Sequence, residues 1–327
     1  MNKQGGFTLI ELLAVIVILA IIAVIAVPIV LNIIDETKNN AELRSPGFYL
    51  DAVEYTISDA YLNHGGLTDG EYPITPEGNL CKTALPCSEE NTLKVEVNGE
   101  TPTSGKIVIT NGNISSIELN YKDGKTIVKN FKGELIYRVK LNDVCILQEG
   151  STANQVGAKY ECDFGDGKRN FYILELGSNP VEGSLLKDDE VALILEGNYD
   201  TTTQAWCASG NDNSCNADGL TSKLDDIAEV WKELEREQIV LPSALQIIVA
   251  NIPSKNTVEY TTGIQPWLYN WDNSEWGNTV YGYWTSTPIA GLPYGAWSVD
   301  SSGSVYGSLV GDVDDGYGVR PVVNLKI

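Results

Sequence analysis

The sequence predicts an α+β protein, and three observations lead to this prediction. A long apolar segment lies near the N-terminus, because residues 12–31 carry no charge and no hydrogen-bonding side chain. Short runs of alternating polar and apolar residues follow at 93–141, separated by Asn-Gly and Asp-Gly pairs that are typical of hairpin turns. The C-terminal region combines strand-like runs, a helical pattern and many aromatic residues. We therefore expect a long helix, a small antiparallel sheet and a larger mixed domain, in that order.

The apolar segment is long enough to cross a membrane. A helix of that length rises about 30 Å, which is the thickness of the hydrocarbon core of a bilayer. We expect the segment to span a membrane or to be buried on all sides in an assembly. Glu11 lies at its start, where a carboxylate costs about 2.5–3.5 kcal/mol, so this residue needs a partner.

The residues before the segment distinguish three kinds of N-terminus. A secretory signal peptide has its cleavage site after the apolar core, whereas the small pair Gly5-Gly6 precedes it here. An unprocessed signal anchor explains the length but neither the glycines nor Glu11. The run from Lys3 to Glu11, KQGGFTLIE, resembles the class III leader of type IV pilins and related pseudopilins. This resemblance covers residues 1 to about 60.

The resemblance implies processing and assembly. A prepilin peptidase would cleave after Gly6 and methylate the amine of Phe7, leaving Glu11 as the fifth residue of the mature chain and Pro28 as a kink in its helix. The positive amine of one subunit would then neutralise Glu11 of a neighbouring subunit and fix its register. The expected partners are the peptidase and methylase, the cytoplasmic membrane before assembly, and other pilin subunits in an extracellular filament.

The pilin-like part is expected to comprise a leader (1–6), a helix (7–62) and an antiparallel β-domain (63–142). Ser45-Pro46 indicates a helix restart and Gly65-Gly66 its end. A buried stripe is expected at Leu50, Val53, Ile57 and Tyr61. The expected strands are Leu93–Val97, Lys106–Thr110, Ile114–Tyr121, Thr126–Phe131 and Leu135–Leu141.

The distal domain is expected at 143–327. Its patterns predict buried strands at Phe171–Leu176 and Val191–Leu195 and a helix at Leu220–Gln238. This helix has an apolar face and a solvated acidic face, and a short helical or buried segment follows it at Ala244–Ala250. The apolar face consists of Leu224, Ile227, Ala228, Trp231 and Leu234, and the acidic face of Glu229, Glu233, Glu235 and Glu237. The last expected strands are Ala296–Val299, Gly303–Gly307 and Val319–Leu325.

The C-terminal motifs Tyr283-Trp284-Thr285-Ser286 and Gly318-Val319-Arg320-Pro321 resemble the end of the C-type-lectin-like fold of bacterial surface proteins. The resemblance covers roughly 169–327. It implies a fold that binds sugars or proteins, so the expected ligand is a glycan or a protein. Arg320 is expected to form a structural ion pair.

Two groups of residues are candidates for ligand binding. Aromatic side chains stack on sugar rings or anchor a protein partner, but they are also common in cores; the candidates are Trp267, Trp271 and Trp276. The run Gly311–Gly316 holds hard oxygen ligands for calcium, although an acidic turn is the commoner explanation in an acidic protein; its acids are Asp312, Asp314 and Asp315. No other metal or cofactor is expected.

Six cysteines follow the apolar segment and form three local couples, which favour disulfides outside the cell. A zinc site needs two tight pairs of ligands, and the chain has a single histidine, His64. The pairs expected are Cys81–Cys87, Cys145–Cys162 and Cys207–Cys215.

The net charge of −22 disfavours nucleic-acid binding, which depends on Lys and Arg. No nucleotide loop, nucleophile elbow or metalloprotease motif appears, so we expect no catalytic site. The sequence therefore predicts a type IV pilus subunit, a modular minor pilin that displays a lectin-like domain for adhesion. The alternatives are a major pilin with a decorative outer domain and a pseudopilin of a type II-like secretion system.

Overall fold

The structure is a computed structural model, and it describes residues 13, 16–18, 43–63, 67–83, 85–200, 202–208, 212–269, 282–311 and 317–327. The chain divides into two compact units, Met1–Gly124 (unit 1) and Lys125–Ile327 (unit 2). Several expected functional residues lie outside the described residues: Gly5, Gly6, Phe7, Glu11, Pro28, Trp271, Trp276, Asp312, Asp314 and Asp315.

Most of the expected membrane-spanning segment also lies outside the described residues. Leu13 and residues 16–18 are helical, and each of these aliphatic side chains is at least half exposed. In the part of the chain that is described, no helix combines the length and the apolar character that crossing a membrane requires.

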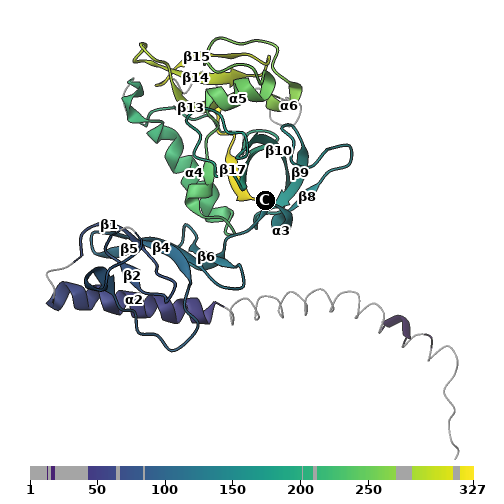
Figure 1. The fold of residues 1–327 in the computed structure, drawn as a ribbon. Coiled ribbons are helices and arrows are strands. Elements are labelled where there is room, and N and C mark those ends of the chain that lie inside the picture. The colour runs from purple at the N-terminus through teal and green to yellow at the C-terminus, as the bar shows by residue number, and fades with distance from the viewer. Residues whose placement is uncertain are drawn as a thin grey trace, which may run out of the picture. The chain divides into compact units, whose positions relative to one another are not determined.

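Unit 1 is built on helix α2 (Arg44–Asn63), which packs on strand β5 (Figure 1). Pro46 lies in its first turn, where the missing N–H removes no intrahelical hydrogen bond. Tyr49, Val53, Ile57 and Ala60 are buried at the helical spacing.

Tyr61 departs from the expected stripe, because it is 44% exposed. Its hydroxyl donates to the Leu67 carbonyl at 3.1 Å. The side chain is therefore hydrogen-bonded to the backbone at Leu67 instead of entering the core.

The sheet of unit 1 contains the hairpin of β4 (Ser104–Thr110) and β5 (Asn113–Asn120), with β1 (Gly70–Pro73) antiparallel to β4. Asn111 and Gly112 form the hairpin turn with φ of 51° and 74°, as an Asn-Gly turn requires.

Two features of this unit differ from the expected meander. The structure contains a strand, β1, that the sequence analysis did not predict. The expected strand Leu93–Val97 contributes only its first residue, which lies in β3 (Thr92–Leu93) and pairs with β2 (Leu80–Cys81) after the short helix η1 (Glu89–Asn91).

Unit 2 contains a six-stranded antiparallel sheet. Both faces of its central strands are buried, since alternate residues of Val191–Leu195 enter two separate hydrophobic clusters. This explains why the strand is apolar at every position rather than at every second one. The strand order is β12 (Ile239–Val240), β17 (Val322–Lys326), β11 (Glu190–Leu195), β10 (Lys168–Leu176), β9 (Lys159–Asp163) and β8 (Cys145–Leu147).

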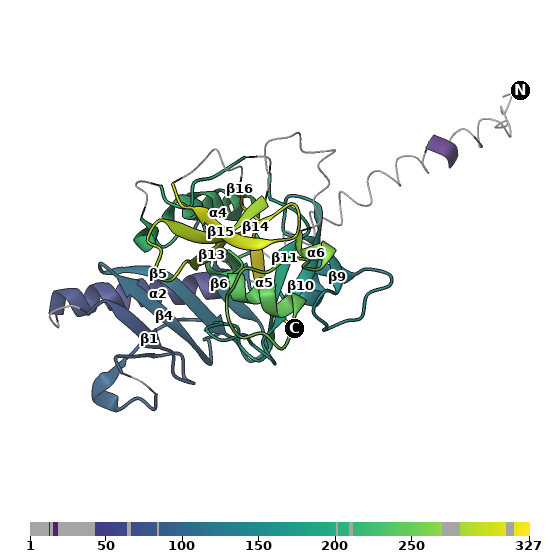
Figure 2. The same cartoon turned by 90° about the horizontal axis from the view of Figure 1, so that it is seen from above.

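A second sheet of unit 2 has four strands, and its last pair is parallel. Helix α5 (Ala244–Asn251) contacts both β10 and β13, so it joins the two sheets (Figure 2). Ser243 caps α5 by accepting a hydrogen bond from the Gln246 amide. The strand order of this sheet is β15 (Val305–Leu309), β14 (Gly295–Asp300), β13 (Gly282–Pro288) and β16 (Tyr317–Gly318).

Helix α4 (Asp218–Val230) is shorter than the sequence predicts. The chain leaves the helix at Trp231, which fills an aromatic cluster with Phe164, Phe171 and Tyr199. Trp231 and Leu234 are buried as expected, but outside a helix. The chain then forms the short helix η3 (Arg236–Gln238).

The prediction that Glu235 is solvated is wrong. This residue is 8% exposed, and both of its carboxylate oxygens accept hydrogen bonds from Arg138, at 2.5 and 3.0 Å. Arg138 follows the hairpin of β6 (Thr126–Lys129) and β7 (Leu135–Tyr137). The pair is thus remote in sequence, and no local pattern reveals it.

Three disulfides link the same pairs that the cysteine spacing predicts: Cys81–Cys87, Cys145–Cys162 and Cys207–Cys215. The second joins directly paired residues of β8 and β9. Helix α3 (Leu141–Val144) precedes it, and η2 (Asn213–Cys215) ends at the third.

Candidate functional site

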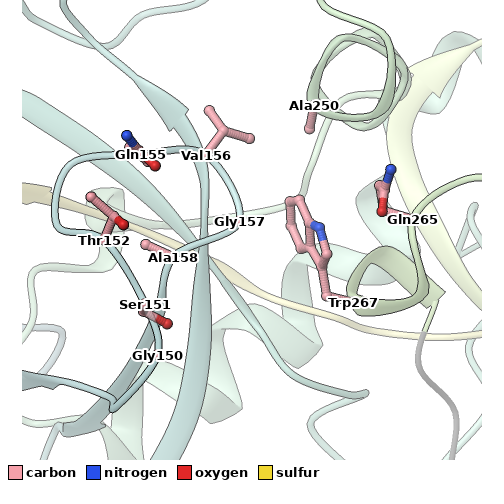
Figure 3. A pocket seen from close by; sticks show the side chains of 10 residues that line it. All are labelled: Gly150, Ser151, Thr152, Gln155, Val156, Gly157, Ala158, Ala250, Gln265 and Trp267. Atoms are coloured by element: carbon pink, nitrogen blue, oxygen red, sulfur yellow. The ribbon is translucent and has the colours of Figure 1, made fainter.

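Unit 2 contains a pocket of about 430 Å³ beside Trp267. Trp267 belongs to the short helix α6 (Pro266–Tyr269), and its indole lies between the β8–β9 loop and the segment that carries Gln265 (Figure 3). Ala250 of α5 closes one side. The β8–β9 loop contributes the rest of the lining: Gly150, Ser151, Thr152, Gln155, Val156, Gly157 and Ala158.

Trp267 is held from three directions. Its ring packs on Tyr172 of β10 with centroids 5.5 Å apart, and its carbonyl accepts a hydrogen bond from Arg320 at 2.7 Å. Gly157 approaches from the loop, where an added Cβ would lie 3.3 Å from the indole nitrogen. Gly157 also has a φ of 86°, which disfavours any side chain. The indole is therefore a fixed wall of the pocket.

Arg320 organises the backbone behind the pocket. It is fully buried, and its guanidinium donates to the carbonyls of Leu195, Glu196, Trp267 and Leu268. From the sequence, Arg320 is expected to form an ion pair. In the part of the chain that the structure describes, its guanidinium is bonded to these backbone carbonyls instead. Its guanidinium also lies over the ring of Tyr283 at 5.1 Å.

Burial shifts the pKa values of Arg320 and Tyr283 in opposite directions. It lowers the pKa of Arg320, since the charged form is poorly solvated there. It raises the pKa of Tyr283 to about 12, and the Tyr283 hydroxyl donates to the Leu268 carbonyl at 2.7 Å. Both side chains donate hydrogen bonds to backbone carbonyls of α6, the helix that carries Trp267.

The far side of Tyr172 is fixed by a charged pair. Its hydroxyl donates to Glu196, which also accepts hydrogen bonds from Lys159 at 2.6 Å and from Asn170 at 2.8 Å. Burial alone would raise the pKa of Glu196, but these hydrogen bonds outweigh it and leave the pKa below its usual value. The pKa of Lys159 is raised, because its bonds to Glu196 outweigh the effect of its burial. The pair therefore remains ionised at neutral pH.

The β8–β9 loop is held by hydrogen bonds to the strands β9 and β10. The Gly157 amide donates to the Ile173 carbonyl at 2.8 Å, and the Ser151 hydroxyl accepts from the Lys159 amide at 3.0 Å. Asn154 adopts a left-handed conformation with a φ of 56°. These contacts hold the polar lining on one side of the indole.

The side chains that the structure describes in the pocket lining are uncharged. It combines one indole with two hydroxyls and two carboxamides, from Ser151, Thr152, Gln155 and Gln265. Hydroxyls and carboxamides both donate and accept hydrogen bonds, whereas none of them titrates near neutral pH. Such a lining suits an uncharged polar ligand with an apolar face.

Sequence reasoning identified Trp267 but not the other pocket residues. The glycines and Asn154 of the loop indicate turns, yet no local signal connects them with a tryptophan more than a hundred residues away. The structure also brings Cys207, Cys215 and Asp218 together. The two cysteines form a disulfide, so neither offers a thiolate to a metal.

Comparison with known proteins matches one part of the chain. Residues 1–27 match the prokaryotic N-terminal methylation motif. No curated protein and no solved structure matches the chain. The leader is thus type IV pilin-like, and the motif indicates a pilin-like or pseudopilin secreted subunit that starts as a membrane precursor, is processed by a prepilin peptidase and assembles with similar subunits.

Proposed function

We propose that this chain is a modular minor pilin. Its N-terminal helix assembles into an extracellular type IV filament, and unit 2 is displayed on that filament as an adhesive, C-type-lectin-like binding module. The observation that carries the proposal is the methylation motif at residues 1–27 in a chain that also contains unit 2. Unit 2 has two internal disulfides and is larger than unit 1. Binding rather than catalysis is the proposed role of unit 2, and no cofactor is required for it.

The surface of α2 supports assembly with further copies. Phe48, Tyr55 and Leu62 follow one another at seven-residue steps and so share one face of the helix. They are 56%, 75% and 84% exposed. Large apolar side chains on one helix face, in a chain with an assembly motif, suit packing against another subunit.

Replacing Glu11 with Ala tests the assembly role. We expect at least tenfold fewer filaments per cell, counted by electron microscopy, because an unpaired amine would enter the apolar filament core. Glu11→Asp, which keeps the charge, should retain more filaments than Glu11→Ala. The matched control is Glu54→Ala, which removes an exposed acid of α2 and should leave the filament count unchanged. Normal filament numbers with Glu11→Ala would refute the proposed assembly.

A further inference from the structure

We infer that the Trp267 pocket binds an uncharged sugar residue, with the sugar ring against the indole and its hydroxyls bonded to the loop and to Gln265. This inference rests on the proposed display function and adds to it the place of the site and the class of its ligand.

The size and shape of the pocket fit a small ligand. Its volume of about 430 Å³ lies in the range of about 300–1,000 Å³ that is usual for small-molecule sites. One wall is an aromatic ring and the opposite side is a polar loop (Figure 3). A sugar ring has the matching two-sided character, because its C–H groups form an apolar face while its hydroxyls point outward.

The absence of charge from the lining selects among ligand classes. A carboxylate or phosphate ligand is normally held by Arg, Lys or clustered backbone N–H groups, and a metal cation by carboxylates or carbonyls. The described residues that line this pocket include no acid and no base, although the chain has 44 acids and 22 bases. Lys159 and Glu196, behind Tyr172, are bonded to each other. The described part of the lining therefore favours a neutral ligand that is rich in hydroxyls.

Pre-organisation supports a binding site rather than an incidental hollow. Trp267 is partly exposed, yet its ring is held by Tyr172 and Gly157 and its backbone by Arg320. The Ser151 hydroxyl accepts a bond from the Lys159 amide, which leaves its own proton to donate. A wall that is already fixed loses little conformational freedom when a ligand binds.

Binding is tested with the full chain in a detergent without a sugar head group. The probes are the methyl glycosides of glucose, galactose, mannose and N-acetylglucosamine, and the charged comparators are methyl glucuronide and glucose 6-phosphate. Saturation-transfer NMR and titration give the dissociation constants. We expect at least one neutral glycoside to bind, and to bind more tightly than both charged comparators.

The variants locate the site. Trp267→Ala should weaken binding at least tenfold, and Gln265→Ala, which changes an exposed side chain outside the core, should weaken it about threefold or more. Tyr294→Ala is the matched control, because Tyr294 is a 56% exposed aromatic residue of the same unit that does not line the pocket. It should bind as the unchanged chain does. If Trp267→Ala does not fold, Gln265→Ala alone decides.

Three results would overturn the inference: no neutral glycoside binds, a charged comparator binds more tightly, or Gln265→Ala and a folded Trp267→Ala bind normally. Filament counts and sugar binding of the unchanged chain separate this inference from the proposed assembly. Normal filaments without sugar binding would reject the sugar site alone, whereas sugar binding without filaments would reject the assembly alone.

Discussion

Replacing Arg320 with Met should lower the free energy of unfolding of unit 2 by at least about 3 kcal/mol. The guanidinium donates to four carbonyls, two of them in buried and two in partly buried hydrogen bonds, and a buried acceptor left without a donor costs about 1–3 kcal/mol. The Leu268 carbonyl keeps the Tyr283 hydroxyl as a donor, so the loss falls on the other three. The Arg320→Met change also removes the desolvation cost of the buried guanidinium. This gain offsets part of the loss, so we place the expected change in the free energy of unfolding near the lower end of the range.

Urea unfolding followed by tryptophan fluorescence measures this effect selectively. All seven tryptophans of the chain lie after Gly124, so the signal reports on unit 2. Lys168→Met is the control, since its ion pair with Glu161 is exposed and should be worth about 1 kcal/mol or less. An Arg320→Met variant no less stable than this control would contradict the role given to Arg320.

Replacing Arg138 with Met should destabilise unit 2 by about 3–5 kcal/mol. Both side chains of the Arg138–Glu235 pair are almost fully buried, at 13% and 10% exposure. Removing the arginine takes two charge-assisted hydrogen bonds from a buried carboxylate, and breaking a buried ion pair by removing one partner typically costs about 3–5 kcal/mol.

A double variant separates the cost of breaking the buried ion pair from a loss of packing. Arg138→Met combined with Glu235→Met replaces both partners by apolar groups, which is often close to neutral. In the same urea measurement, the double variant should therefore recover most of the stability lost by the single one. If the double variant is as unstable as Arg138→Met alone, packing of the arginine stem and not the buried charge explains the effect.

Local patterns predicted much of the secondary structure. The apolar run at Val191–Leu195 forms β11, the Asn111-Gly112 pair forms a hairpin turn, and the expected segment Ala244–Ala250 forms α5. The disulfide pairs follow from short sequence separations of 6 to 17 residues. Each of these features depends on residues that are near one another in the chain.

Features that depend on distant residues were missed. The end of α4 is set by the aromatic cluster around Trp231, and the burial of Glu235 by Arg138, 97 residues away. The pocket needs Gly157 and Trp267, which meet only because β10 lies between their segments. Periodicity carries no information about such contacts.

The candidate site was predicted only in part for the same reason. Trp267 drew attention as an aromatic residue in an aromatic-rich stretch, whereas Gln155 and Gln265 are ordinary polar residues until the fold places them around one cavity. Arg320 was recognised as structural, but its carbonyl partners belong to two segments of the chain that are distant from it in sequence.

The N-terminus of the extracellular protein tests the central claim most directly. Filaments sheared from cells and analysed by peptide mass spectrometry should yield an N-terminal peptide that begins at Phe7 and carries a methyl group on its amine, as the methylation motif at residues 1–27 requires. An N-terminal peptide that begins at Met1, or at a residue beyond the apolar segment, would contradict the account.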